Sequence, residues 1–186
     1  FTQKRYDTIG AMVRNGVFLN TMFALLLCAI MTIVYFNVHR MGQPTELLPL
    51  IRPYFLLYLA GIVPVAIFNA FAQWAYAINR TKMPMWIILI ANILNIIGNY
   101  VLIYGKCGFP EMGLTGAGIS TLFARIFTMV AIAIVFFCFK DYRNYSAGYK
   151  QSQLSLRMLR QINRTSWPVA LQMALETGAF SVAAIM

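Results

Sequence analysis

Glu176 is the acidic residue of this sequence best placed to do chemistry, because it lies about ten residues inside an apolar run. At 1.5 Å per residue, a helix there would carry the carboxylate about 15 Å deep, near the centre of a bilayer. Burial disfavours the charged form, so this group should carry a proton near neutral pH or hold a cation. Gln172, one helical turn earlier, could share that site through its carbonyl oxygen. A purely structural hydrogen bond is the alternative interpretation.

Three asparagines form a second candidate site. Asn92, Asn95 and Asn99 fall within about 60° of one another on a helix, and they lie in an otherwise apolar stretch. An amide in hydrocarbon needs a hydrogen-bond partner, so this face should point into the protein or a wet cavity. Two interpretations stay open: hydrogen bonds that join neighbouring helices, and the lining of a substrate cavity.

Arg125 is the single cation deep inside an apolar run. It could bind an anionic substrate or pair with an acid elsewhere in the protein. It could also be structural, packed against the carbonyl groups of a neighbouring helix. On the same segment Gly116, Ser120 and Ala124 are spaced four apart, which predicts close helix packing. Gly113, Ala117 and Thr121 repeat that spacing.

The segments that carry these residues are predicted to be membrane-spanning helices. Of the 186 residues 60% are hydrophobic and 11% charged, against roughly 45–50% and about 25% in soluble domains. Runs of 18 or more apolar residues are typical of spanning helices. The sequence therefore predicts an all-α polytopic bundle. Its spans are expected at about 16–38, 53–79, 83–105 and 113–139, with a kink at Pro64, and a fifth, truncated helix at 166–186 that opens near Trp167 and Pro168.

The net charge of +10 is explained by topology, not by nucleic-acid binding, because the basic residues flank the spans. Counted by alternate sides, eleven Lys and Arg residues lie on one face and three on the other. The N-terminal segment and the 140–165 loop are therefore expected to be cytoplasmic. Both chain ends are expected to be cuts in a longer protein, because Phe1 is not an initiator Met and Met186 lies in an apolar run.

The 140–165 loop is predicted to contain an amphipathic helix on the membrane surface. Its apolar positions recur at helical spacing, while its arginines point elsewhere. The apolar positions are Leu154, Met158, Leu159 and Ile162, and the arginines are Arg157, Arg160 and Arg164. This segment is interpreted as a linker resting on anionic lipid headgroups, with a lipid sensor as the alternative.

Motifs for enzymatic chemistry are not found in the sequence. It has no Gly-rich phosphate loop, nucleophile elbow or metal motif, and its single histidine, His39, has no partner at metal-ligand spacing. An intramembrane enzyme would need clustered carboxylates, a His pair or a catalytic dyad within the spans. A transporter without a cofactor is therefore expected.

Several stretches resemble the multidrug-and-toxin-extrusion (MATE) family. They are Thr2 to Arg5, Asn79-Arg80-Thr81-Lys82-Met83-Pro84, and Gly105 to Pro110 followed by Glu111 to Ala117. Asn95 and Asn99 resemble the paired polar positions of that family's fifth helix, and Glu176 resembles the acid of its seventh. In some members the second polar position is Asp, whereas here it is Asn99.

The resemblance implies part of a two-lobe, 6+6 helix transporter: helices three to six of the N-terminal lobe over residues 1–139, the inter-lobe linker over 140–165, and the first helix of the C-terminal lobe. It implies a multi-pass antiporter of the cell (inner or plasma) membrane that exports small organic, often cationic, compounds in exchange for Na⁺ or H⁺. Membrane lipids and the remainder of the same chain are the other expected partners. A flippase of lipid-linked saccharides in the wider superfamily is the alternative, and it predicts a strongly basic cavity.

Overall fold

The computed structural model describes residues 2–37, 48–106 and 108–168. Within these ranges the regular structure is entirely helical, which confirms the predicted all-α class. The elements are α1 (Thr2–Asn37), α2 (Leu48–Ala60), α3 (Ile62–Ala77), α4 (Lys82–Ile103), α5 (Gly113–Cys138), the short 3₁₀ helix η2 (Lys140–Tyr142) and α6 (Arg143–Gln151). Residues 156 to 168 are also helical.

Four helical segments are long and apolar enough to cross a membrane: Tyr6–Asn37, Ile51–Ala77, Lys82–Ile103 and Gly113–Cys138. Large apolar side chains cover their outer surfaces, among them Ile33 at 63% exposure and Ile96 at 67%. In water such a surface would be unfavourable, but hydrocarbon solvates it, and each helix satisfies its own backbone hydrogen bonds. The predicted polytopic membrane bundle is therefore confirmed.

The first helix begins well before the predicted start at residue 16. Its N-terminal part carries Asp7 and Arg14 and extends beyond the uncharged stretch. A helix does not have to end where the hydrocarbon ends, since its charged part can continue in water or among the headgroups. The absence of charge therefore predicts the membrane-embedded part of α1, but not the whole helix.

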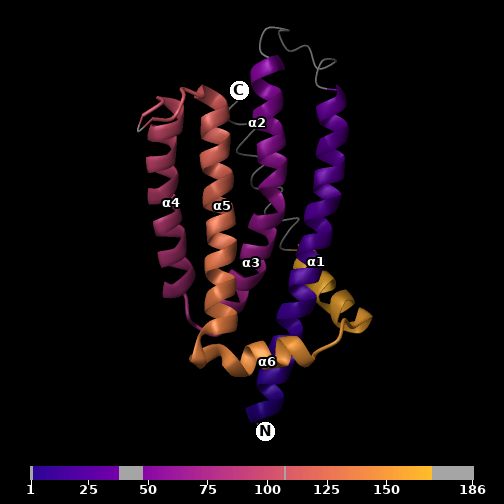
Figure 1. The fold of residues 1–186 in the computed structure, drawn as a ribbon. Helices are drawn as coiled ribbons and strands as arrows, with labels where there is room; N and C mark the ends of the chain where they lie inside the picture. The colour runs from indigo at the N-terminus through magenta and orange to yellow at the C-terminus, as the bar shows by residue number, and fades with distance from the viewer. Residues whose placement is uncertain (1, 38–47, 107, 169–186) are drawn as a thin grey trace.

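The predicted second span is two helices, separated at Gly61. Pro64 has no backbone N–H to donate to the carbonyl four residues earlier, which explains why the regular helix is interrupted there. The Gly61 N–H donates to the carbonyls of Leu57 and Tyr58, at 3.2 and 3.1 Å. α3 consequently tilts away from the direction of α2 (Figure 1). The kink expected at Pro64 is thus seen as a break three residues earlier.

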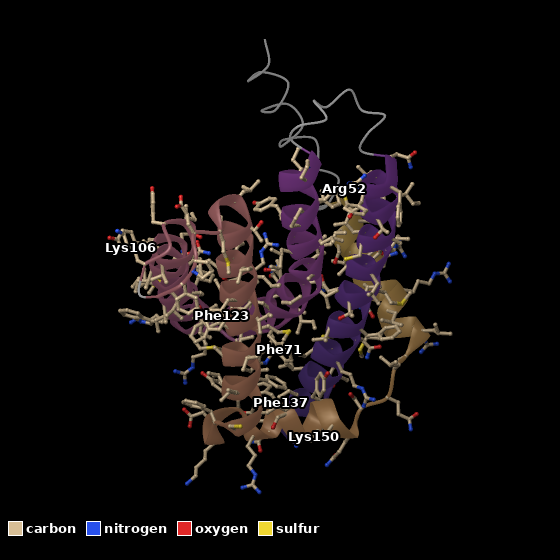
Figure 2. The ribbon with its side chains drawn as sticks, turned by 45° about the horizontal axis from the view of Figure 1, so that its top comes forward. Arg52, Phe71, Lys106, Phe123, Phe137 and Lys150 are labelled. Atoms are coloured by element: carbon tan, nitrogen blue, oxygen red, sulfur yellow. The ribbon has the colours of Figure 1, made fainter. Side chains whose placement is uncertain are left out.

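One end of the bundle is strongly basic. The start of α1, the α3–α4 connection and the end of α5 lie at this end, and α6 lies across it (Figure 1). Arg52 and Lys106 lie toward the other end, away from Lys150 (Figure 2). This arrangement agrees with the two-sided charge distribution in the sequence, while the assignment of the basic end to the cytoplasm stays a prediction.

Aromatic rings hold α3, α5 and α6 together at the basic end. Trp74 packs edge-on against Phe136 at 4.7 Å and against Tyr142 at 5.1 Å between ring centroids. Phe136 is fully buried and also contacts Phe71 at 5.0 Å. Perpendicular rings of this kind contribute about 0.5–1.5 kcal/mol per pair beyond their buried area. The cluster fixes the direction in which the chain leaves α5.

α6 crosses α1 with the two backbones in direct contact. A Cβ atom added at Gly10 would lie 2.5 Å from the backbone nitrogen of Tyr149, and one at Gly148 would lie 2.8 Å from the Cα of Asp7. Tyr145 packs beside this crossing, 4.8 Å from the ring of Tyr6. Burial there raises the pKa of the Tyr145 hydroxyl, and the neighbouring Tyr6 adds to the effect.

Two side chains of α1 hold the segment that follows α6. Arg14 donates to the carbonyl oxygens of Tyr149 and Ser152. Asn15 is fully buried and accepts a hydrogen bond from the backbone N–H of Ser155 at 3.0 Å. The carbonyl of Ser155 in turn accepts the N–H of Leu159 at 2.9 Å, in the first turn of the 156–168 helix. The start of this helix is therefore attached to α1.

The 156–168 helix has the predicted division between its faces. Met158, Leu159 and Ile162 are half-buried, whereas its three arginines are exposed. Leu154 precedes the helix and is itself exposed. The helical stretch that begins at residue 156 continues without a break through 166, so Trp167 and Pro168 do not lie at a helix start; the remainder of the helix expected at 166–186 lies outside the described residues.

Candidate functional site

A polar network joins α4 to α5. The Asn95 Nδ2 atom lies 3.4 Å from the hydroxyl oxygens of both Ser120 and Thr121, to which it donates. Asn99 donates to the Asn95 side-chain oxygen at 3.2 Å. The Ser120 hydroxyl donates to the backbone carbonyl of Asn95 at 2.9 Å. Two of the three predicted asparagines therefore act together.

Small residues allow these two helices to approach closely enough for the network to form. A Cβ added at Gly116 would lie 2.7 Å from the backbone oxygen of Leu102, and one at Gly98 would overlap the Ser120 hydroxyl. Gly116, Ser120 and Ala124 are all buried. The close packing predicted from their spacing is confirmed, and the same contact brings the Asn95 amide within reach of hydroxyl partners.

Asn92 lies outside the network. It is exposed, whereas its neighbour Ala91 is buried, at 4% exposure. The packed ridge of α4 runs through Ala91 and Asn95, and Asn92 is about 100° around the helix from Ala91. The three asparagines therefore do not share one packed face. Asn95 lies on the packed side of α4, whereas Asn92 is exposed. A role for Asn92 in a cavity stays a prediction.

Arg125 lies against the break between α2 and α3. Its guanidinium lies 4.8 Å from the centre of the Tyr58 ring and 3.5 Å from the Tyr58 backbone oxygen. A Cβ added at Gly61 would lie 2.6 Å from its Nη1 atom, so a larger residue there would require the guanidinium to move. A backbone carbonyl and an aromatic face both stabilise a cation. The packing against carbonyls considered for Arg125 is thus present.

Thr121 lies between the network and Arg125. It accepts the hydrogen bond from Asn95, and it also lines a narrow crevice together with Arg125, Tyr58 and Tyr54. On the other side of Asn95 the Asn99 side-chain oxygen is buried without a hydrogen-bond partner. An unpaired buried carbonyl oxygen is costly, and it can accept an N–H group or contribute to binding a cation. This oxygen is the best candidate ligand-binding atom among the described residues.

Other predicted site residues are not part of this geometry. Glu176 and Gln172 lie outside the described residues, so the predicted coupling site stays a prediction. The residues that the structure describes contain no cluster of His, Cys, Asp or Glu able to hold a metal ion.

Three hydrogen-bond partners are not predicted from the sequence. The spacing of Ser120 and Thr121 predicts packing, although their hydroxyls also allow hydrogen bonds. The Tyr58 carbonyl is not predicted as the acceptor for Arg125, because the position of the helix break beside it is not predicted.

The network predicts different effects for two substitutions on the same helix. Asn95→Ala should lower the stability of the full-length protein by roughly 1–2 kcal/mol, because it removes two interhelical hydrogen bonds of about 0.6 kcal/mol each and the hydrogen bond from Asn99 within α4. Asn92→Ala, the matched control, should have little effect since that side chain is exposed. Thermal unfolding in detergent measures both changes. Equal shifts for the two variants would show that the network does not stabilise the α4–α5 contact.

Comparison with known proteins identifies relatives of the chain. A sequence model of the MatE family matches residues 1–101. A probable multidrug resistance protein NorM from Photorhabdus laumondii is 32% identical over 137 residues, which cover 74% of this chain and 30% of the relative. Proteins of the same description from Synechococcus and Geobacillus kaustophilus are 26% and 25% identical, and cover 96% and 100% of this chain.

The chain spans only part of the length of these relatives. The matches cover 30% of the Photorhabdus protein, 38% of the Synechococcus protein and 41% of the Geobacillus protein. No solved structure shows a significant match.

Proposed function

The chain belongs to the MATE family, and on that basis we propose that the full-length protein is a secondary exporter of small organic compounds, driven by Na⁺ or H⁺. MATE proteins are transporters and not enzymes, which agrees with the absence of catalytic motifs from the sequence. The observation that supports the proposal most directly is the hydrogen-bond network between α4 and α5 with its unpaired Asn99 oxygen, within a bundle whose outer surface is apolar.

In this proposal Asn95 and Asn99 line the substrate path of the N-terminal lobe. The unpaired Asn99 oxygen would accept a hydrogen bond from an N–H group of the substrate, or it would orient an acid on a neighbouring helix. The amides of Asn95 and Asn99 carry no charge, so they can form hydrogen bonds with a polar group of either a cationic or an uncharged compound. Glu176 and Gln172 would form the cation site of the other lobe, and transport would proceed by rocking of the two lobes.

Efflux from cells tests the export activity. Cells that express the full-length protein should accumulate less of a fluorescent organic cation than cells with an empty vector. Dissipating the membrane ion gradients should remove that difference, because a secondary transporter has no other energy source. Efflux that persists after the gradients have collapsed would contradict the proposal.

The flippase alternative makes a different demand on Arg125. A pyrophosphate-linked lipid needs free cationic groups, whereas the Arg125 guanidinium already contacts the Tyr58 ring and backbone oxygen. We therefore expect Arg125→Ala to affect mainly folding and stability, and to leave transport by the remaining folded protein largely intact. Lipid-linked saccharide translocation that is lost in Arg125→Ala, but unchanged in Glu176→Gln, would favour the flippase.

A further inference from the structure

The corner between α5 and α6 contains a basic cavity that the transport proposal does not use. Its volume is about 360 Å³, and its lining includes Phe137, Phe139, Lys140, Arg143 and Lys150. No acidic residue lines it. The three basic side chains are exposed and converge at the point where the chain turns out of its last described spanning helix.

The chain reaches this corner by a defined turn. α5 ends at Cys138, Phe139 adopts an extended conformation, and η2 leads into α6. The backbone N–H of Tyr142 donates to the Phe139 carbonyl at 3.1 Å, and the buried Tyr142 ring packs on Trp74. The turn is therefore anchored by the aromatic cluster, and the cavity has a fixed frame.

The faces of α6 explain why the cations gather on one side. Arg143, Ala147 and Lys150 are four and three residues apart, so they share one face of the helix. Gly148 lies on the opposite face, which packs against α1. The Ser146 hydroxyl, which also borders the cavity, donates to the Arg143 carbonyl. Recognition in the cavity therefore depends on the cationic groups.

An apolar wall adjoins the cations on the side of the spanning helix. Phe137 and Phe139 are exposed at 37% and 54%, and the Lys150 ammonium lies 5.9 Å from the centre of the Phe137 ring. Phe137 and Lys150 lie together at the basic end of the bundle (Figure 2). A ligand that fits must place an anion among the cations and an apolar group along α5. A free phosphate satisfies only the first requirement.

We propose that this corner binds an anionic phospholipid, with its phosphate among Lys140, Arg143 and Lys150 and an acyl chain along Phe137 and Phe139. The position at the end of a spanning helix suits a headgroup at the membrane surface, where each Lys or Arg strengthens binding to an anionic lipid about fivefold. The three arginines of the 156–168 helix do not line this cavity, so we expect that helix to attract the same lipids only diffusely.

The test compares two variants of the full-length protein with the same loss of charge. One carries Lys140→Gln, Arg143→Gln and Lys150→Gln, and the matched control carries Arg157→Gln, Arg160→Gln and Arg164→Gln. Native mass spectrometry measures phosphatidylglycerol retained after delipidation, with phosphatidylcholine as the reference lipid. The first variant should lose retention by on the order of 100-fold, and the control should keep most of it. Equal loss in the two variants, or equal retention of both lipids by the wild type, would overturn the proposal.

A second measurement needs no charge variant. Cys138 lines the same cavity and is exposed. In a full-length protein with Cys138 as its sole cysteine, phosphatidylglycerol should slow alkylation of this thiol severalfold, whereas phosphatidylcholine and inorganic phosphate should not. Equal protection by the two lipids would refute a headgroup-specific site. Protection by inorganic phosphate at the same concentration would identify a free anion as the ligand and would also overturn the proposal.

Discussion

Replacing Glu176 with Gln is expected to abolish gradient-driven transport by the full-length protein while leaving it folded. The substitution keeps the size and hydrogen-bonding capacity of the side chain, but it removes the proton that the carboxyl group can take up and release. A carboxylate at the depth expected for Glu176 must be protonated or hold a cation, and in the proposed mechanism alternation between these states couples ion movement to export.

Glu111→Gln is the matched control for this prediction. Glu111 is exposed in the connection between α4 and α5. Glu111→Gln removes one acidic group, as Glu176→Gln does, but it should leave the transport rate unchanged. Transport rates in proteoliposomes, together with the elution profile on size exclusion, separate lost coupling from lost folding. Wild-type, gradient-dependent efflux by Glu176→Gln would exclude Glu176 as the coupling residue.

A single methyl group at Gly10 is expected to destabilise the protein severely. The added Cβ would lie 2.5 Å from the Tyr149 nitrogen and 2.6 Å from the Tyr145 oxygen. Both atoms belong to the backbone of α6, so the whole helix would have to move. Overpacking of this kind costs about 1–3 kcal/mol when side chains can adjust, and more when the obstacle is backbone. Gly10→Ala should therefore lower the melting temperature and the yield of folded protein.

Gly16→Ala, on the same helix, is the control for that substitution. No atom of the described residues lies within 4 Å of a Cβ at Gly16. Alanine also favours the helical conformation by up to about 1 kcal/mol relative to glycine, so stability should be unchanged or slightly higher. If both variants melted at the wild-type temperature, the close crossing of α1 and α6 would be refuted.

The sequence predicts the spanning helices well, because a long stretch without charged residues marks the part of a helix that lies in the hydrocarbon. It predicts α6 less well, since this helix is short and polar. The residues on its buried face include Tyr145 and Tyr149, which do not stand out as an apolar stripe. Their rings pack inward, while Arg143 and Lys150 face outward. α6 is therefore amphipathic, although the sequence analysis assigned that property only to the segment that follows it.

The polar residues of the candidate site could be predicted only in part. Helical spacing placed Asn95 and Asn99 together, but it could not exclude Asn92, because the edge of the packed face depends on how α4 lies against α5. The residues that contact Arg125 also could not be predicted from the sequence. The acceptor is a backbone carbonyl, and it becomes accessible at a helix break that the sequence located only to within a turn.

The attachment of the linker to α1 has a similar explanation. Asn15 lies at the border between the charged and uncharged parts of its helix, where a polar residue would not be unusual. Only the fold brings it against the N–H of Ser155, about 140 residues later in the chain. Together with Arg14 it attaches the segment after α6 to α1, so we expect this segment to move with α1 in the proposed transport cycle.

Transport by the full-length protein in proteoliposomes, with Na⁺ and pH gradients imposed separately, tests the central proposal most directly. A fluorescent organic cation should move against its own gradient when one of these two gradients is present, and that gradient identifies the coupling ion. The wild type should show this activity and Glu176→Gln should not. If folded wild-type protein responds to neither gradient, the antiporter proposal is wrong.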